Sequence, residues 1–305
     1  MANRASVAIQ GRARAPRPKR RRLGLPGWIA EILKYLVLIL LAASFILPFY
    51  WMATSALKTD SEIYTVPPVW FPQHPRWNNY PDAWRVSNFN LYVVNTIVRY
   101  AVPLTIAVTL SSAIVAYGFS RLRWPGRDTL FSVCLATMMI PGAVTMVPLF
   151  ITFKHLGWIN TYLPLVVPGF SGSAYFVFML RQFFLTIPEE LSDAARIDGA
   201  NEFGILFRIV LPLAKPALTV VALFTFMSAW NDYFGPLIYI NKDSQYPIAL
   251  SIQNLSRAIS QMGSHQFAYP YLMAVSTVVT LPILVAFFVA QRSFIEGISL
   301  TGLKG

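Results

Sequence analysis

The stretch YLVLILLAASFILPFYWMATSAL, residues 35–57, contains 23 residues and no charged side chain. A helix that crosses the hydrocarbon core of a bilayer needs about 20 mainly apolar residues, so this stretch is long enough to span a membrane. It is too long for the apolar part of a secretory signal peptide, and no small-residue cleavage site follows it. The stretch therefore predicts a membrane-spanning helix.

Five more apolar segments of similar length follow along the chain. They are residues 100–119, 130–153, 162–180, 217–240 and 268–290. Prolines inside several of them are tolerable, because neighbouring helices can satisfy the carbonyl groups that a proline frees. Only 12% of the 305 residues are charged, about half the share in a soluble domain. We therefore predict an all-α integral membrane protein with six transmembrane helices.

The distribution of basic residues predicts the orientation of these helices, since cytoplasmic connections are enriched in Lys and Arg. With the N-terminus inside, 18 of the 25 Lys and Arg residues fall in cytoplasmic segments: 9 in 1–34, 3 in 120–129, 4 in 181–216 and 2 in 291–305. The remaining 7 fall in the opposite connections. We predict that both termini are cytoplasmic and that connections 58–99 and 241–267 are external.

The N-terminal residues 1–28 form a tail that we separate from a transmembrane domain of residues 29–305. Eight of the 25 basic residues lie in residues 1–22, among several prolines. Such a composition cannot bury enough apolar surface to fold alone, so we expect a disordered tail. Because the tail precedes the first span, anionic lipid headgroups are a more fitting partner for it than nucleic acid.

The sequence gives no support for catalysis. Cys134 is the one cysteine, and the three histidines, His74, His155 and His265, are far apart, so no metal-ligand spacing is present. No Gly-Lys dipeptide occurs, which excludes a phosphate-binding loop of the Walker A kind. We expect a protein that is not an enzyme, with no catalytic residue, no metal site and no bound cofactor. Any ATP-driven process would need a partner polypeptide.

The longest connection predicted on the cytoplasmic side is residues 181–216, which we call the elbow. We expect one helix that ends near Asp198, followed by Gly199 in the left-handed conformation that commonly ends a helix. Asn201 can cap a second short helix, and Pro212 ends or redirects it towards the next span. The elbow is therefore predicted to be a helix–turn–helix.

Apolar side chains in the second elbow helix, Phe203, Ile205, Leu206 and Phe207, are candidates to anchor a partner protein. The alternative is an elbow that packs only on its own domain. The spacing of these residues leaves both interpretations open.

The segment DAARIDGANEFGILFRIVLP, residues 193–212, resembles the EAA motif of binding-protein-dependent importer permeases. That motif is Glu-Ala-Ala, three residues, Gly, nine residues, then Ile-x-Leu-Pro. Asp193 replaces the first Glu and keeps its carboxylate on a shorter side chain. The other positions match at Ala194, Ala195, Gly199, Ile209, Leu211 and Pro212.

The resemblance extends from about residue 45 to residue 305. Stretches such as NTIVRY, AYGFSRLRWPGR, AWNDYFGPLIYI and GISLTGLKG are similar to the carbohydrate-uptake branch of these permeases. Within that branch they resemble the MalG-like subunit. The resemblance implies a MalG-like ABC permease fold in the cell membrane of a bacterium or archaeon.

By the same resemblance, the chain is the permease subunit of an ATP-binding-cassette importer that translocates a sugar. The implied partners are a second, non-identical permease, two ATPase subunits that hold ATP and Mg, an extracytoplasmic sugar-binding protein, and membrane lipid. The residues implied to couple to an ATPase are Glu190, Asp193, Ala194, Ala195, Asp198, Gly199, Phe203 and Pro212.

A second group of candidates would meet the sugar or its binding protein. Trp230, Asn231 and Asp232 combine a stacking face with hydrogen-bonding groups, as sugar recognition requires. Ser256 and Met262 lie in connection 241–267, which corresponds to the family's loop that enters the binding protein. Tryptophan also populates membrane interfaces generally. Asp232 is the one acidic residue within a predicted span, and a capping role competes there with a proton relay.

The alternative function is a gradient-driven carrier or channel with six spans. Such transporters usually place carboxylates or histidines inside their spans, and this chain lacks them apart from Asp232. They also have no need of the elbow. Which sugar the importer would carry is left open by the sequence.

Overall fold

The computed structural model describes residues 27–86, 88–262 and 269–302, without the side chains of Gly27, 258–262 and 292–302. The described residues form helices and turns and contain no strand. Residues up to Pro48 and residues from Phe49 onward are two separate compact units. Helix α1 (Gly27–Ser55) begins in the first unit and ends in the second. Almost all of the predicted tail, 1–28, lies outside the described residues.

Four helical stretches are long and apolar enough to cross a membrane: Trp28–Ser55, Phe89–Arg121, Leu163–Thr186 and Tyr269–Gln291. Two further pairs of helices, each bent sharply at a short break, raise the number to six if each pair is one span. The prediction of an all-α membrane protein is confirmed, and six is the upper count of its candidate spans among the described residues.

The second candidate span is continuous and begins at Phe89 rather than at the predicted residue 100. It consists of α4 (Phe89–Val94), the π-helix η1 (Asn95–Ala101) and α5 (Val102–Arg121). The wider π turns stand directly before Pro103, which has no N–H for the carbonyl four residues earlier. The π-helix thus lets the span continue through a proline.

The predicted span 130–153 is bent. Its two helices, α6 (Arg127–Thr137) and α7 (Gly142–His155), meet at 94°. The break ends at Pro141, which precedes α7. Hydropathy alone made these residues one segment, because it measures composition and not direction.

The predicted span 162–180 contains a break that α5 seals. It consists of α8 (Leu163–Val166), a 3-10 turn η2 (Val167–Ser171) and α9 (Ala174–Thr186). Ser111 Oγ donates to the Gly169 carbonyl at 2.9 Å, and the Ser173 N–H donates to Ser112 Oγ at 3.1 Å. Side chains of α5 therefore satisfy backbone groups that the break would leave open.

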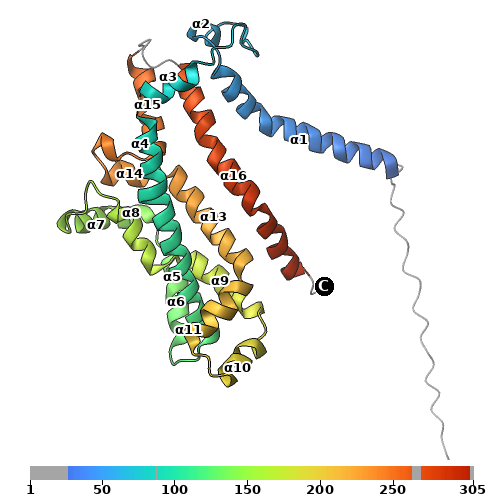
Figure 1. The fold of residues 1–305 in the computed structure, drawn as a ribbon, viewed down its shortest axis with the longest axis vertical. Helices are drawn as coiled ribbons and strands as arrows, with labels where there is room; N and C mark the ends of the chain where they lie inside the picture. Colours follow the sequence, from blue (N-terminus) through green and yellow to red (C-terminus); the bar gives the residue numbers. More distant parts are fainter. Residues whose placement is uncertain (1–26, 87, 263–268, 303–305) are drawn as a thin grey trace, which may run out of the picture. The chain divides into compact units, whose positions relative to one another are not determined.

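The elbow lies at one end of the second unit (Figure 1). It contains α10 (Glu190–Ile197), α11 (Glu202–Ile205), the π-helix η3 (Leu206–Val210) and α12 (Leu211–Leu213). The chain then turns by 81° into α13 (Lys215–Asn231). A buried cluster packs the elbow against α5, α9 and α13; it includes Ala116, Leu180, Phe184, Ile205, Leu206 and Val221.

The opposite end of this unit carries the shorter helices of the remaining connections. These are α2 (Asp60–Ile63), α3 (Asn79–Val86), α14 (Phe234–Tyr239), the 3-10 turn η4 (Asp243–Gln245) and α15 (Ile248–Met262). The last helix, α16 (Tyr269–Gly302), packs on α13 and α3. A second buried cluster lies here and includes Phe89, Tyr92, Trp230, Ile248, Leu255 and Ala274.

Most of connection 241–267, which the sequence analysis treats as a loop, is the helix α15. Ile248, Ile252 and Leu255 follow one another at spacings of four and three residues, so they share one face of the helix. All three belong to the second buried cluster or pack against it. Burial of this face stabilises a helix where the residue count suggested a loop.

A lysine is buried at this end. Lys58 has 0% exposed area, and its Nζ lies 3.7 Å from the centre of the Trp51 ring and 3.4 Å from Ser55 Oγ. The Asn79 amide donates to the Lys58 carbonyl at 3.0 Å. Burial lowers the pKa of Lys58, and the charge of Glu62 opposes this shift.

Candidate functional site

The turn of the elbow is built from backbone hydrogen bonds. The N–H of Gly199 donates to the Arg196 carbonyl at 3.1 Å, and the N–H of Ala200 donates to the Ala195 carbonyl at 2.9 Å. Gly199 has φ of +83°, as predicted, so α10 ends in a Schellman motif. Asn201 Oδ1 accepts the N–H of Gly204 at 2.7 Å and caps α11, which confirms the second expected signal.

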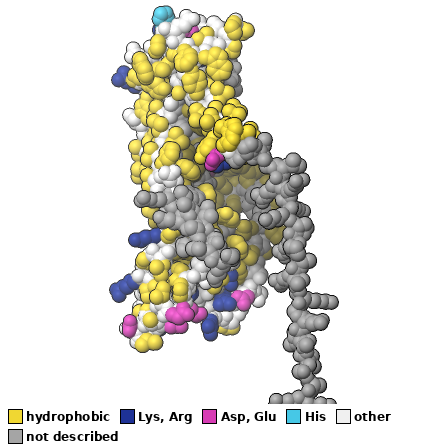
Figure 2. All heavy atoms as spheres, turned by 90° about the vertical axis from the view of Figure 1, so that its right-hand side faces the viewer, with side chains coloured by type: hydrophobic (Ala, Val, Ile, Leu, Met, Phe, Trp, Pro, Cys, Tyr) yellow, Lys and Arg dark blue, Asp and Glu magenta, His cyan; other side chains and the backbone are white. Residues whose placement is uncertain are grey.

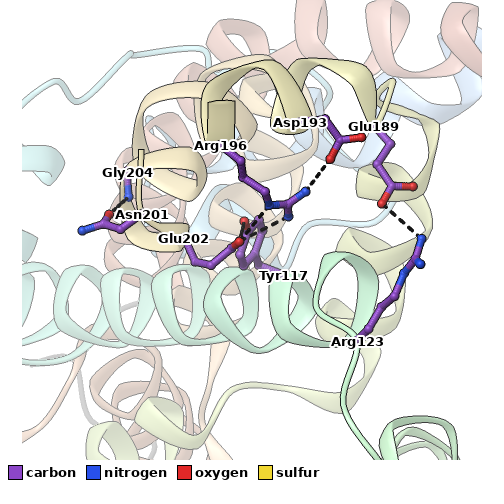
Figure 3. Close-up of polar contacts among 8 residues, drawn as sticks. All are labelled: Tyr117, Arg123, Glu189, Asp193, Arg196, Asn201, Glu202 and Gly204. Atoms are coloured by element: carbon purple, nitrogen blue, oxygen red, sulfur yellow. Dashed lines mark hydrogen bonds and ion pairs between the residues drawn. The ribbon is translucent and has the colours of Figure 1, made fainter. Parts of the chain in front are cut away.

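A chain of charged contacts holds the two elbow helices together (Figure 3). Arg196 of α10 donates through Nη1 to Asp193 Oδ1 at 2.7 Å and through Nε to Glu202 Oε1 at 2.9 Å. The contact with Glu202 raises the pKa of Arg196, so the guanidinium stays charged. Asp193, which occupies the first position of the motif, therefore has a partner within its own chain.

The same network reaches the second candidate span. The Tyr117 hydroxyl of α5 donates to Glu202 Oε2 at 2.5 Å. The Tyr117 ring is buried in the cluster that packs the elbow. This hydrogen bond ties the start of α11 to a helix that crosses the whole unit.

A buried arginine fixes α5 to α9 beside the elbow. Arg121 donates through Nη2 to the carbonyls of Phe184 and Ile187, each at 2.5 Å. Phe184 lies in the last turn of α9 and Ile187 directly follows that helix, where carbonyl groups lack intrahelical donors. The direction of the chain as it enters the elbow is thus set by α5.

An open cavity of about 760 Å³ lies between these groups. On one side it is lined by the residues that follow α5, including Arg123 and Trp124, and on the other by Glu189, Asp193 and Glu202. Arg123 and Glu189 face each other at 3.7 Å with largely exposed side chains. Exposed ion pairs of this kind contribute little to stability.

The elbow also exposes apolar side chains. Ile197 is 87% exposed and Phe203 68%, and Phe207 is half-exposed. Ile205 and Leu206 are buried in the chain's own core, as expected of an elbow that packs on its own domain, whereas Phe203 and Phe207 are exposed. Acidic side chains also lie at this end of the second unit, with Lys and Arg among them (Figure 2). The exposed surface of the elbow thus combines acidic groups with bare apolar ones.

The remaining predicted elbow residues lie on or beside the same two helices. Glu190, Ala194 and Asp198 are exposed on α10 or at its end, whereas Ala195 packs against the buried cluster. Pro212 is exposed on α12. Nothing in the sequence had pointed to Tyr117, to the exposed Ile197 or to the pairing of Arg196 with Glu202. The spacing of Asp193 and Arg196, three positions apart on a helix, was a readable signal.

The second predicted group is divided. Trp230 is 2% exposed, stacks on Phe226 with ring centres 5.7 Å apart, and belongs to the core. Asn231 is exposed and donates to the Met227 carbonyl at 2.8 Å. The structure therefore brings these two neighbours into different surroundings.

Asp232 stands at the break between α13 and α14. Its carboxylate accepts the Tyr100 hydroxyl at 2.5 Å and the Gly235 N–H at 3.0 Å. The second contact is a capping geometry across the break. Ser256 is half-buried on α15, and Met262 is the last residue of that helix, with its side chain outside the described set. Within the described residues no cluster of His, Cys, Asp or Glu could hold a metal.

The family model and the relatives similar in sequence to this chain are all membrane components of transport systems. The family described as "Binding-protein-dependent transport system inner membrane component" matches residues 107–299. The diacetylchitobiose uptake system permease protein NgcG of Streptomyces coelicolor is 32% identical over 88% of this chain and 87% of its own length. The lactose transport system permease protein LacG of Rhizobium radiobacter is 32% identical over 88% of this chain and 95% of its own.

The fold is also found among solved structures, of which we describe one. It is a crystal structure of a bacterial ABC transporter involved in the import of the acidic polysaccharide alginate. The TM-score is 0.73 at 22% identity, and the match covers 87% of this chain and 96% of that one.

Proposed function

Because the chain belongs to the family of binding-protein-dependent transport system inner membrane components, we propose that it is the permease subunit of an ATP-binding-cassette importer for a sugar. An extracytoplasmic binding protein delivers the sugar. Partner ATPase subunits supply the energy, and ATP and Mg are bound by those subunits and not by this chain. A second, non-identical permease completes the pathway in the lipid bilayer.

The elbow is the observation that carries this proposal. Its first helix is held at a fixed angle by the Schellman turn at Gly199 and by the Arg196 ion pairs. Its surface exposes Ile197 and Phe203, which an aqueous environment does not favour. A rigid helix with bare apolar side chains suits insertion into a groove of another protein. Docking of an ATPase at this surface would couple its closure to the spans.

The proposed orientation follows from the basic residues. The bias of 18 to 7 in Lys and Arg supports a cytoplasmic position for the elbow and for both termini. The same assignment places α15 on the outer face, where a binding protein would dock. Figure 1 is consistent with this division, since α10 and α15 lie at opposite ends of the second unit.

The proposed cargo class is a mono- or oligosaccharide. Relatives that are 32% identical are named for diacetylchitobiose and for lactose. Both are disaccharides with different substituents, so we propose the class of sugar and no single member of it. Trp230 is buried in the core, so we assign it no direct contact with the sugar.

The test is reconstitution of this chain with and without its partners. The chain should be purified alone and with a second permease and an ATPase from the same organism, then placed in vesicles with the binding protein. We expect ATP hydrolysis and sugar uptake only from the complete complex. Hydrolysis by the isolated chain would refute the proposal, and uptake driven by an ion gradient without any ATPase would establish the carrier alternative.

A further inference from the structure

Hydrogen bonds anchor the start of α15 to the second candidate span. Thr96 Oγ1 accepts the N–H of Ile248, the first residue of α15, at 2.8 Å, and donates to the Tyr92 carbonyl at 2.8 Å. The Asn95 amide donates to the carbonyls of Ser244 and Tyr246, each at 3.1 Å. Asn95, Thr96 and Ile248 are fully buried.

The other end of the same span is anchored to the elbow. Tyr117 donates to Glu202 of α11, and Arg121 donates to the carbonyls of Phe184 and Ile187 that precede α10. Thr96 and Tyr117 are 21 residues apart, which is about 30 Å along a helix. The helical segment Phe89–Arg121 therefore makes side-chain contacts with the segments at both ends of the unit.

The other helices that enter the elbow are interrupted. The candidate span that contains α9 is broken by the 3-10 turn η2, and α13 meets α12 at a bend of 81°. The helical conformation continues without a break from α4 through η1 to α5. A helix without a break carries a displacement along its axis more directly than one that is interrupted, since rigid secondary elements carry coupling between distant sites.

The two residues that bind the start of α15 and the chain before it lie in a π-helical part of this span. Asn95 and Thr96 are the first two residues of the π-helix η1. Short π-helical segments are rare and frequently occur at functional sites. The displacement of α15 would thus act on the part of the span whose hydrogen bonding is least regular.

We propose that the helix Phe89–Arg121 transmits the docking of the binding protein at α15 to the elbow, with Thr96 and Tyr117 as positioning residues at its two ends. This inference rests on the proposed function. It assigns a route between two surfaces on opposite faces of the membrane, and it makes the hydroxyl groups of two residues that touch neither sugar nor nucleotide necessary for coupling.

The first test is Thr96→Val in the complete complex in vesicles. Valine keeps the shape of the side chain and leaves the buried N–H of Ile248 without its partner. We expect the stimulation of ATP hydrolysis by saturating sugar-loaded binding protein to fall about fivefold or more, with basal hydrolysis and complex yield unchanged. The matched control is Thr225→Val, which removes a buried hydroxyl that bonds only to the Val221 carbonyl of its own helix.

The second test is Tyr117→Phe, which removes the hydroxyl that binds Glu202 and keeps the ring. We expect the same loss of stimulation. Tyr239→Phe is its control, because the Tyr239 side chain is buried and its hydroxyl makes no hydrogen bond among the described residues. A change that merely destabilises the protein would lower basal hydrolysis and yield together, and neither should move here.

The third test combines Thr96→Val with Tyr117→Phe and asks whether one helix links the two positions. Residues about 30 Å apart normally have additive effects. If the helix is one transmitting element, Thr96→Val and Tyr117→Phe together should cost no more stimulation than either alone. Full stimulation in the single variants, or additive losses in the double variant, would overturn the inference. Absence of stimulation in the wild-type complex would instead refute the proposed function.

Discussion

Gly199 determines the angle between the two elbow helices, because it forms the turn that ends α10. Its φ of +83° lies in left-handed space, and a Cβ added there would meet no atom within 4 Å. A substitution is therefore penalised only through the backbone, by about 1–2 kcal/mol for a β-branched residue. Gly199→Val should insert into the membrane at near-normal abundance, lose most co-purification of the ATPase, and lose sugar uptake.

The control for this change is Gly199→Asn, since asparagine tolerates left-handed backbone better than valine does. It should retain most uptake. Asp193→Asn should also be mild, because Arg196 keeps its second partner, Glu202. Normal uptake by Gly199→Val would mean that the bend does not couple the two proteins, and loss of the variant from the membrane would mean that its role is structural.

Lys58 gives a prediction about pH. Its pKa is lowered by burial, so between that lowered value and the usual one the unfolded chain binds more protons than the folded one. Stability from this group therefore rises with pH in that window. Lys58→Met keeps the packing over Trp51 without the charge. Its thermal midpoint in detergent should equal or exceed that of the wild type at neutral pH, and the difference should shrink at alkaline pH.

The comparison variant for Lys58 is Lys242→Met at an exposed lysine. Its difference from the wild type should stay constant over the same pH range. A clear loss of stability in Lys58→Met at neutral pH would show that the ammonium group makes a contact the fold requires.

Signals that act within a few residues were predictable from the sequence, and distant contacts were not. Gly199 and Asn201 were correctly assigned because a helix end depends on its immediate neighbours. The hydrogen bond from Tyr117 to Glu202 joins positions 85 residues apart, and no local pattern indicates it. Burial of Ile205 and exposure of Ile197 likewise depend on which face of the elbow meets α5 and α9.

At the scale of elements, α15 is the helix whose function can be tested by shortening. Removal of one turn within residues 254–262 should leave the buried face at Ile248 and Ile252 in place. We expect normal assembly and basal ATP hydrolysis in the complete complex, with weaker stimulation by sugar-loaded binding protein. Undiminished stimulation would mean that α15 is a passive connection. Deletion of four residues from the exposed, non-helical stretch 64–68 serves as the control.

Two elements show why hydropathy predicts helices better than their shape. The π-helices η1 and η3 each stand before a proline, Pro103 and Pro212. The prolines were visible in the sequence, but a helix can accommodate a proline by a kink, a break or a π turn. Packing decides among these, as it does for the 94° bend between α6 and α7.

For the whole molecule, the proposed orientation can be tested with single cysteines. Cys134→Ser provides the background, since Cys134 is the one native cysteine. A cysteine at exposed Ser61 should react in intact cells with a thiol reagent that cannot cross the membrane. A cysteine at Leu191, exposed on α10, should react only after the cells are opened.

The choice of Leu191 matters because its neighbour Ser192 is 1% exposed. A cysteine at Ser192 would be shielded on either side of the membrane and would give no information. Labelling of Leu191→Cys from outside in intact cells would reverse the orientation and place the elbow on the wrong side for an ATPase.

Composition was sufficient to predict the class of the molecule but not its internal arrangement. Six apolar segments and the motif at 193–212 led to the family that the comparisons support. The packing of α5 at the centre, against α9 and α13, needed the structure. Small residues on α5, such as Ala107, Ala113 and Ala116, permit that packing. They are common in membrane helices and did not single out this one.

The anchors of the second span also have a consequence for synthesis. The partners of Asn95 and Thr96 lie 149 to 152 positions later in the chain. A ribosome that adds roughly 5–20 residues per second needs about 8 to 30 seconds to reach them. Throughout that interval the nascent chain presents polar side chains that lack their final acceptors and donors. A polypeptide that ends before Ser244 therefore leaves the buried Asn95 amide without either of the acceptors that it has in the finished subunit.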